Sequence, residues 1–257
     1  MRRKLVLIFF LFVTLVSSTY GQNSLAYKSK WQFRTLSGGN IPITKLLQGT
    51  ETDYLLQYKD HSYYLQLLSG SYFFHKHWGV DLNLRIGGSS EIGERTDEFI
   101  AKIHSRYGDN YFVSAETKES SEVFHQGYIG VIYRLETNKF YVYPTLSIGV
   151  TAIYTNRWQA HLKEKNSNNE YELSLSNESK PSTGFFFTLA PSVSFGYKLS
   201  KLVFLNADVT FSYFRPNFAS KKEFVNLYTR ESSVEYFDYK KDILTLGLGV
   251  GVIIAIY

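Results

Sequence analysis

The sequence predicts an all-β fold: an eight-stranded antiparallel up-and-down transmembrane β-barrel with short periplasmic turns and long extracellular loops. Three features of the 257 residues lead to this prediction. The C-terminal segment alternates strictly between large apolar and small residues, tight turns recur at a fixed interval, and most strands have one apolar face and one face of small or polar residues.

The final strand is predicted over Ile243–Tyr257, which reads ILTLGLGVGVIIAIY. Every second residue from Leu244 to Ile256 is large and apolar. The residues between them begin with Thr245, Gly247, Gly249 and Gly251. A glycine at every other position disfavours a helix, whereas a period of two is typical of a strand. A strand with one large apolar face and one face of small residues suits the wall of a membrane barrel.

Three tight turns are centred on Lys76, Asn138 and Ser200, so the interval is 62 residues both times. A hairpin repeat with a short turn at one end and a long loop at the other explains this spacing. The strands beside the turns are predicted at Ser62–Phe74 and Gly79–Ile86, Val123–Leu135 and Phe140–Tyr154, and Thr183–Leu199 and Leu202–Phe214. A first strand within Lys28–Leu36 and the final strand bring the number to eight.

The polar face decides which side of the barrel is inside. A soluble lipocalin-like barrel is apolar within, and its water-exposed face would be rich in Lys and Glu. Here the polar face is mostly Gly, Ser, Thr, Asn and Tyr, sizes that fit a narrow interior. Interface girdles of aromatic residues are predicted near the turns (Trp78, Tyr133, Tyr141, Tyr197) and near the loop ends (Tyr128, Tyr154, Phe185, Phe211, Tyr213). Pro144 and Pro191 lie inside strands, where they predict bulges or strand offsets.

The N-terminus predicts export. Arg2, Arg3 and Lys4 precede an apolar stretch too short to span a membrane as a helix, and small residues follow, so residues 1–21 read as a signal peptide cleaved before Gln22. Residues 22–257 form the predicted barrel domain, placed in the cell outer membrane. Without the three basic signal residues, 25 basic residues face 23 acidic ones, which removes the main support for nucleic-acid binding. The chain has no cysteine, which excludes a lipoprotein anchor and disulfides.

The chain resembles the small outer-membrane β-barrel proteins of Bacteroidota, related in architecture to the OmpA transmembrane domain and the PorT-like barrels. The resemblance rests on Gly21-Gln22, the eight alternating strands, the glycine-punctuated last strand and the terminal aromatic Tyr257. It implies that Tyr257 belongs to the signal read by the barrel-assembly machinery. Tyr257 shares parity with the glycines rather than with Ile256, so either a bulge intervenes or the signal is imperfect. No peptidoglycan-binding domain is expected after the barrel.

Few charged residues are predicted to face the lumen: Asp81, Arg85, Arg134, Lys198 and Asp208. Arg85 lies nine residues beyond its turn and Asp208 eight beyond its own, on strands that are opposite in a ring of eight. We expect this pair to meet across the lumen and help close the pore, because buried charges persist when they are paired. The alternative is that each charge meets trapped water.

No catalytic residues, metal ligands or cofactor site are predicted. His75-x-His77 has a metal-site spacing, but a solvated turn is the better interpretation. The remaining histidines show no His-x-Ser pairing on a strand, and a helix within Asp97–Tyr107 would only order its loop. Any specific function should lie in the long loops Gly38–Asp60, Ser89–Glu122, Arg157–Ser182 and Arg215–Asp242.

Three function classes stay open. The first is a structural or surface-interaction barrel that acts through its loops. The others are a narrow channel for small solutes, favoured if the glycine face of the last strand leaves space, and a lipid-modifying enzyme. The predicted partners are outer-membrane lipids and lipopolysaccharide, the barrel-assembly machinery and a surface or envelope protein, with no nucleic acid.

Overall fold

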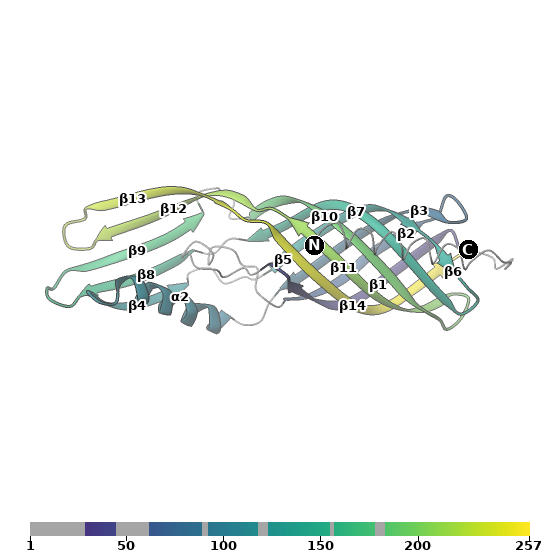
Figure 1. Ribbon diagram of the computed structural model, residues 1–257, viewed down its shortest axis with the longest axis horizontal. Coiled ribbons are helices and arrows are strands. Elements are labelled where there is room, and N and C mark those ends of the chain that lie inside the picture. The colour runs from purple at the N-terminus through teal and green to yellow at the C-terminus, as the bar shows by residue number, and fades with distance from the viewer. Residues whose placement is uncertain (1–28, 45–61, 89–91, 118–122, 155–156, 178–182) are drawn as a thin grey trace, which may run out of the picture.

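The computed structural model describes residues 29–44, 62–88, 92–117, 123–154, 157–177 and 183–257. They form a closed β-barrel and a second, smaller sheet that projects from one end of it (Figure 1). The short turns and the C-terminus lie at the opposite end of the barrel. The predicted signal peptide lies outside the described residues.

Eight long strands form the barrel, each paired antiparallel with the next, and the pairing of β10 with β7 completes the ring. A two-residue strand, β6 (Leu135–Glu136), continues the line of β5 along β7. In ring order the long strands are β1 (Trp31–Pro42), β2 (Ser62–Tyr72), β3 (Trp78–Gly88), β5 (Val123–Tyr133), β7 (Phe140–Tyr154), β10 (Thr183–Lys198), β11 (Val203–Phe214) and β14 (Ile243–Ile256). The predicted all-β, eight-stranded antiparallel barrel is confirmed.

The strand ends agree with the sequence prediction to within two residues, except at the first strand. β7 has the predicted bounds, whereas β1 begins at Trp31 and runs on to Pro42, past the predicted end at Leu36. The prediction was wrong here because Ser37, Gly38 and Gly39 resemble a loop. In the structure, backbone pairing with β14 holds them in the wall, with Gly38 opposite Gly249.

A bulge explains why the second strand shows no clean alternation. The register between β2 and β3 shifts between Gln66 and Leu68, so the residues that face the lumen change from even to odd numbers. Tyr64 and Gln66 are buried before the shift, and Ser69 and Ser71 after it.

The expectation of bulges at the two prolines was wrong. The register of β7 with β10 is unchanged across both Pro144 and Pro191. Each proline instead interrupts the pairing of its strand with the neighbouring strand on the other side. Pro144 of β7 lies at the gap between β5 and β6, and Pro191 of β10 lies at a gap in the pairing with β11. The register is the same on both sides of each gap. A missing N–H therefore removes ladder pairing locally without inserting a residue.

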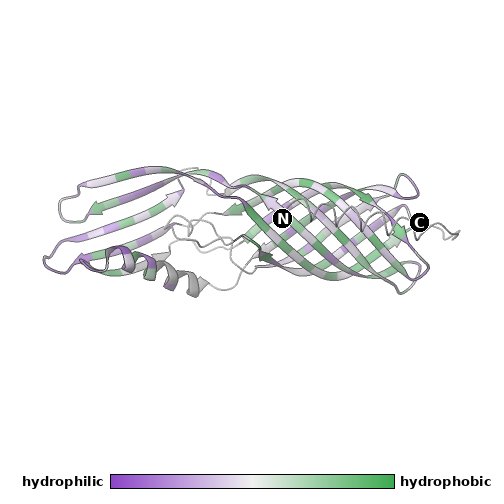
Figure 2. Ribbon diagram, in the orientation of Figure 1, coloured by the Kyte–Doolittle hydropathy of each residue, from purple (hydrophilic) through white to green (hydrophobic). Residues whose placement is uncertain are grey.

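Hydrophobic and hydrophilic residues alternate along the barrel strands (Figure 2). The exposed ones are mostly apolar and the buried ones mostly polar, so the outer face is apolar and the interior polar. On β3, for example, Val80, Leu82 and Leu84 are exposed while Asp81 and Arg85 are buried. Six predicted girdle residues lie on the outer face: Trp78, Tyr133, Phe185, Tyr197, Phe211 and Tyr213.

Two girdle predictions were wrong. Tyr128 and Tyr141 are 3% and 2% exposed and lie inside the lumen. Their parity on β5 and β7 places them on the same face as Gln126 and Tyr143, so position along the strand alone misplaced them. Tyr154 has no described side chain.

The segments predicted as loops contain a second sheet. Its strand order is β13 (Ser232–Lys240), β12 (Asn217–Asn226), β9 (Glu170–Asn177), β8 (Trp158–Glu164) and β4 (Tyr111–Thr117), all antiparallel. The helix α2 (Ile92–Tyr107) packs against β4. It contains the predicted helix and begins five residues earlier, and its Ile103 is fully buried.

Two barrel strands run on almost directly into this second sheet, which we call the extracellular sheet because its segments are the loops predicted to be extracellular. Only residues 215–216 separate β11 from β12, and only residues 241–242 separate β13 from β14. Alternation also continues, since exposed and buried residues alternate without a break from Phe211 to Ser220. The face of the sheet that α2 covers is therefore the continuation of the lumen face, and the opposite face continues the outside of the barrel.

Among the described helical residues, no helix is long and apolar enough to cross a membrane.

Candidate functional site: the filled lumen and the extracellular sheet

Four charged residues form a central charge layer inside the barrel: Arg34, Asp81, Arg85 and Asp208, each 5% exposed or less. Arg34 joins the two carboxylates, with its Nη2 2.7 Å from Asp81 Oδ1 and its Nη1 3.7 Å from Asp208 Oδ2. Arg85 Nη2 lies 3.2 Å from Asp208 Oδ1. The formal charges of the layer sum to zero, which is the condition under which buried ions are tolerated.

Hydroxyl and amide groups complete the layer. Ser71 Oγ donates to Asp81 at 2.5 Å, and Asn83 donates to the other oxygen of the same carboxylate. Ser194 and Thr210 donate to the two oxygens of Asp208 at 2.7 and 2.6 Å. The carboxylates therefore have hydrogen-bond donors besides the arginines, which a buried ion pair needs in order to offset its lost hydration.

The guanidinium of Arg85 is held between two aromatic rings. Its Cζ lies 4.8 Å from the ring centroid of Tyr64 and 5.7 Å from that of Tyr128. Its Nε donates to Gln66 Oε1 at 2.9 Å. Rings and amide fix the orientation of Arg85 towards Asp208, on the far side of the lumen.

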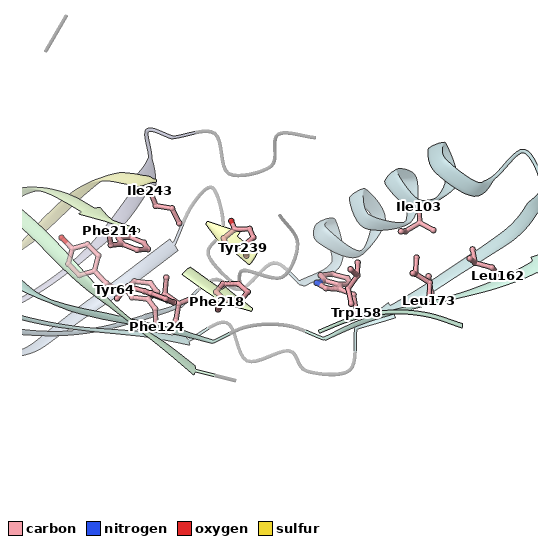
Figure 3. Close-up of a cluster of buried hydrophobic side chains, with 14 of the residues drawn as sticks. Tyr64, Ile103, Phe124, Trp158, Leu162, Leu173, Phe214, Phe218, Tyr239 and Ile243 are labelled. Atoms are coloured by element: carbon pink, nitrogen blue, oxygen red, sulfur yellow. The ribbon is translucent and has the colours of Figure 1, made fainter. Parts of the chain in front are cut away.

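An apolar layer fills the barrel end from which the sheet projects. We call it the mouth layer; its members, Leu36, Tyr64, Phe124, Ile153, Phe186, Phe214 and Ile243, are all buried. The same cluster of buried side chains extends through Phe218 and Tyr239 to Trp158 and Ile103 under the helix (Figure 3). The mouth of the barrel and the extracellular sheet therefore share one apolar core.

A second apolar layer lies near the short turns. This floor layer consists of Phe73, Ile132, Tyr141, Tyr143, Phe204, Ile253 and Ala255. Tyr141 Oη donates to Asn206 Oδ1 at 2.6 Å, so the large side chains are fixed by polar contacts as well as by packing.

A group of charged side chains accompanies the floor layer. Arg134 stacks on the ring of Phe73, with 3.3 Å from its Cζ to the ring centroid, and its Nη2 donates to the backbone oxygen of Ser29 at 2.6 Å. Lys198 Nζ donates to Glu136 Oε2 at 2.6 Å, and Arg134 Nε is 3.6 Å from the other oxygen of that carboxylate. These contacts tie Ser29, two residues before β1, to the turn end of the barrel.

The structure places the five predicted lumen charges inside the barrel and brings Arg85 and Asp208 together, while Arg134 and Lys198 belong to the floor. Sequence reasoning missed Arg34 and Glu136. The register of β1 was unknown, so nothing assigned Arg34 to the lumen. Glu136 follows the break opposite Pro144, and its alternation with β5 was not visible.

The glycine face of β14 leaves little room. A Cβ at Gly249 would lie 2.7 Å from Tyr64 Oη and 2.8 Å from Leu36 Cδ1, and a Cβ at Gly251 would meet backbone atoms of β1. The space above these glycines is taken up by residues of β1 and β2.

Tyr257 directly follows the end of β14, and no register shift occurs in that strand, so the bulge considered from the sequence is not present. The Tyr257 Oη donates to the Lys201 backbone oxygen at 2.8 Å.

The outer face of the extracellular sheet carries a cross-strand row that was not predicted. Ser114 is directly opposite His161, and His161 Nε2 lies 3.3 Å from Glu170 Oε2. The His161 and Glu170 side chains are 45% and 37% exposed, so the row is a solvated surface pair. In the adjoining turn, hydrogen bonds from Ser167 and Asn169 lower the pKa of Glu164 below its usual value.

The histidines of the first turn have structural contacts. His77 Nδ1 lies 3.0 Å from the backbone oxygen of Arg134, and its ring stacks on that of Tyr133. Within the described part of the chain no three His, Cys, Asp or Glu residues are grouped so that they could hold a metal ion.

The closed ring of strands, its apolar outside and its polar, filled interior define this protein as a transmembrane β-barrel. The comparisons with family models and with curated proteins found no match.

Three solved structures illustrate the similarity. They are a major outer membrane protein from Thermus thermophilus (12% identity over 87% of this chain and 98% of that chain, TM-score 0.38), Ail, the attachment invasion locus protein of Yersinia pestis (11%, 88% and 99%, 0.37), and the outer membrane protein OprG from Pseudomonas aeruginosa (15%, 88% and 95%, 0.37). Similarities this low carry no argument of their own, and the fold rests on the strand pairing.

Proposed function

We propose that this protein is a non-conducting barrel of the cell outer membrane that holds its extracellular sheet at the cell surface as an interaction module. The observation that carries the proposal is the continuity between wall and sheet. β11 and β14 pass into β12 and β13 through two residues each, so the sheet is attached by paired strands rather than by flexible loops.

The connection is reinforced where the strands leave the barrel. Lys241 N donates to the Pro216 backbone oxygen at 3.4 Å, and Tyr213 Oη donates to Asp242 Oδ1 at 2.6 Å. Inside, the mouth layer joins the core beneath α2. A paired and packed junction of this kind supports a fixed orientation of the sheet relative to the membrane.

The filled lumen supports the absence of conduction. An eight-stranded barrel encloses a space that side chains can fill. Here a mouth layer, a central charge layer and a floor layer follow one another along the axis. The condition that favours a channel, free space above the glycines of β14, is not supported, because Tyr64 and Leu36 lie against Gly249.

The location and partners belong to the same proposal. Lipid and lipopolysaccharide surround the apolar wall, the barrel-assembly machinery inserts the chain, and a surface or envelope protein binds the sheet. The narrower likeness to small barrels of Bacteroidota rests on Gly21-Gln22 and the last strand.

Conductance of the purified full-length protein in a planar lipid bilayer tests the proposal. We expect no defined unitary current. Phe124→Ala with Phe214→Ala removes two rings from the mouth layer, and Tyr141→Ala with Phe204→Ala does the same in the floor layer. Both double variants should also stay closed, because the central charge layer still fills the lumen. Steady unitary currents from the unmodified protein would refute the closed barrel and favour the narrow channel.

A further inference from the structure

Four exposed lysines surround the short-turn end of the barrel. Lys76, Lys139 and Lys201 lie in the turns between β2 and β3, β6 and β7, and β10 and β11, and Lys30 directly precedes β1 beside the end of β14. These positions follow every second strand of the closed ring, so the four lysines are spread around its whole circumference. We call them the lysine ring.

The lysine ring is not neutralised by nearby acidic side chains. Among the described residues, Glu136 is the acidic residue of this end, and its buried side chain is paired with Lys198 and Arg134. None of the ion pairs formed within the described part of the chain includes a ring lysine. The described acidic residues with exposed side chains lie in or beside the extracellular sheet and its helix: Asp97, Asp109, Glu231, Glu235, Asp238 and Asp242.

Exposed apolar side chains next to the lysines set their depth in the membrane. Trp31, Trp78, Phe140 and Leu202 each lie one or two residues from a ring lysine and are between 47% and 59% exposed. Tryptophan and other aromatic residues at the ends of a membrane barrel lie at the level of the lipid headgroups. A lysine directly beside such a residue therefore has its ammonium group within reach of headgroup phosphates.

We propose that the lysine ring binds the headgroups of anionic phospholipids in the leaflet at the short-turn end. Each lysine near an anionic lipid surface strengthens binding about fivefold. The even spacing of the ring suits the shell of lipids, which contacts the barrel on all sides, and the adjacent wall residues favour lipid over a partner in the water beyond. The inference needs only the transmembrane barrel, and it does not depend on what the extracellular sheet binds or on whether the lumen conducts.

Quenching of tryptophan fluorescence by brominated lipids tests the proposal. The full-length protein is reconstituted at low ionic strength into equal amounts of phosphatidylcholine and phosphatidylglycerol, with bromine on the acyl chains of one lipid at a time. Trp31 and Trp78 report the lipids beside two of the ring lysines, whereas the third tryptophan, Trp158, is buried in the extracellular sheet. We expect phosphatidylglycerol to be enriched about fivefold over phosphatidylcholine, and the enrichment to fall as salt is added.

Charge-removing and charge-keeping variants assign the enrichment to the ring. Replacing all four ring lysines with glutamine should leave the two lipids quenching equally, while heat-modified mobility shows that the barrel is still folded. Replacing the same four lysines with arginine keeps the charge and should keep the enrichment. Lys240→Gln, the matched control, removes an exposed lysine of the extracellular sheet and should also keep it.

Three results would overturn the inference. Equal quenching by the two lipids in the unmodified protein would show that the ring does not select anionic headgroups. An enrichment that survives in the quadruple glutamine variant would show that other residues cause it. Co-sedimentation of the detergent-solubilised protein with peptidoglycan, lost in the quadruple variant and without any lipid preference, would assign the ring to a cell-wall polymer instead.

Discussion

Replacing Asp208 with asparagine should destabilise the barrel, because this carboxylate is the partner of two buried arginines. Arg85 Nη2 lies 3.2 Å from one of its oxygens and Arg34 Nη1 lies 3.7 Å from the other, and Thr210 and Ser194 donate to the same two oxygens. The side-chain amide of asparagine has one oxygen and one NH₂ group. Its two N–H groups must therefore point at either the Arg85 and Thr210 donors or the Arg34 and Ser194 donors. The hydroxyls can turn to accept a hydrogen bond, whereas a guanidinium cannot.

The magnitude follows from the burial of the pair. Both side chains are 4% exposed or less, and removing one partner of such a buried pair typically costs about 3–5 kcal/mol of unfolding free energy. At about 2–4 °C per kcal/mol for a chain of this size, the melting temperature should fall by about 6–20 °C.

Heat-modified electrophoretic mobility and thermal melting in detergent measure this loss. Asp238→Asn, at an exposed position of the extracellular sheet, is the matched control and should melt as the unmodified protein does. The double replacement Arg85→Met with Asp208→Leu removes both charges together and should recover most of the lost stability. If Asp208→Asn leaves mobility and melting unchanged, the ion pair does not stabilise this barrel and the reasoning is refuted.

Three further predictions concern the last strand, the extracellular sheet and its turn. Gly249→Leu should overpack against Tyr64 and lower the free energy of unfolding by about 1–3 kcal/mol. Gly39→Ala is the matched control and should be tolerated in the same melting assay, because its Cβ would meet its nearest atom at 3.5 Å. Trp158→Ala should cost the sheet about 3–5 kcal/mol and expose it to limited proteolysis while the heat-modified mobility of the barrel persists; equal protease resistance would contradict this. The lowered pKa of Glu164 stabilises the turn above the usual glutamate pKa, and this contribution is lost as pH falls through the lowered value. The protection of the turn amides, measured as exchange relative to the intrinsic rate at each pH, should therefore fall in acid. Asn169→Ala should reduce that pH dependence, and protection that does not change with pH would disprove the link.

Much of the barrel could be predicted because each strand contains its own signal. β7 has the same bounds in the sequence prediction and in the structure, and the outward residues of β14 are those of its alternation. Counting from the turns also placed Arg85 and Asp208 on opposite strands. In the structure, Arg85 Nη2 lies 3.2 Å from Asp208 Oδ1. These inferences needed only a period of two and a ring of eight.

The interior was predicted less completely. Arg34, which joins both carboxylates of the central charge layer, lies on a strand whose alternation is weak. The parity of β2 reverses at the bulge after Gln66, so no single pattern describes that strand. Tyr128 and Tyr141 were assigned to the girdles because aromatic residues suit both an interface and a packed lumen.

The extracellular sheet was not predicted at all. Lys221, Lys222 and Glu223 on β12 look like a solvated loop, yet they pair with β9 in an unbroken register. The helix was anticipated only as an ordering element, and its position against β4 has no signature in its own residues.

The sequence by itself determined most of the wall of this protein: its turns, seven of its eight strands and the outward residues of the strands that alternate cleanly. A lipid environment acts on each strand separately, so it leaves a pattern within every strand. Only the tertiary structure decided how the lumen is filled and that the loop segments form a sheet. Those contacts join residues as distant as Arg34 and Asp208, whose proximity depends on the closure of the ring between β1 and β14.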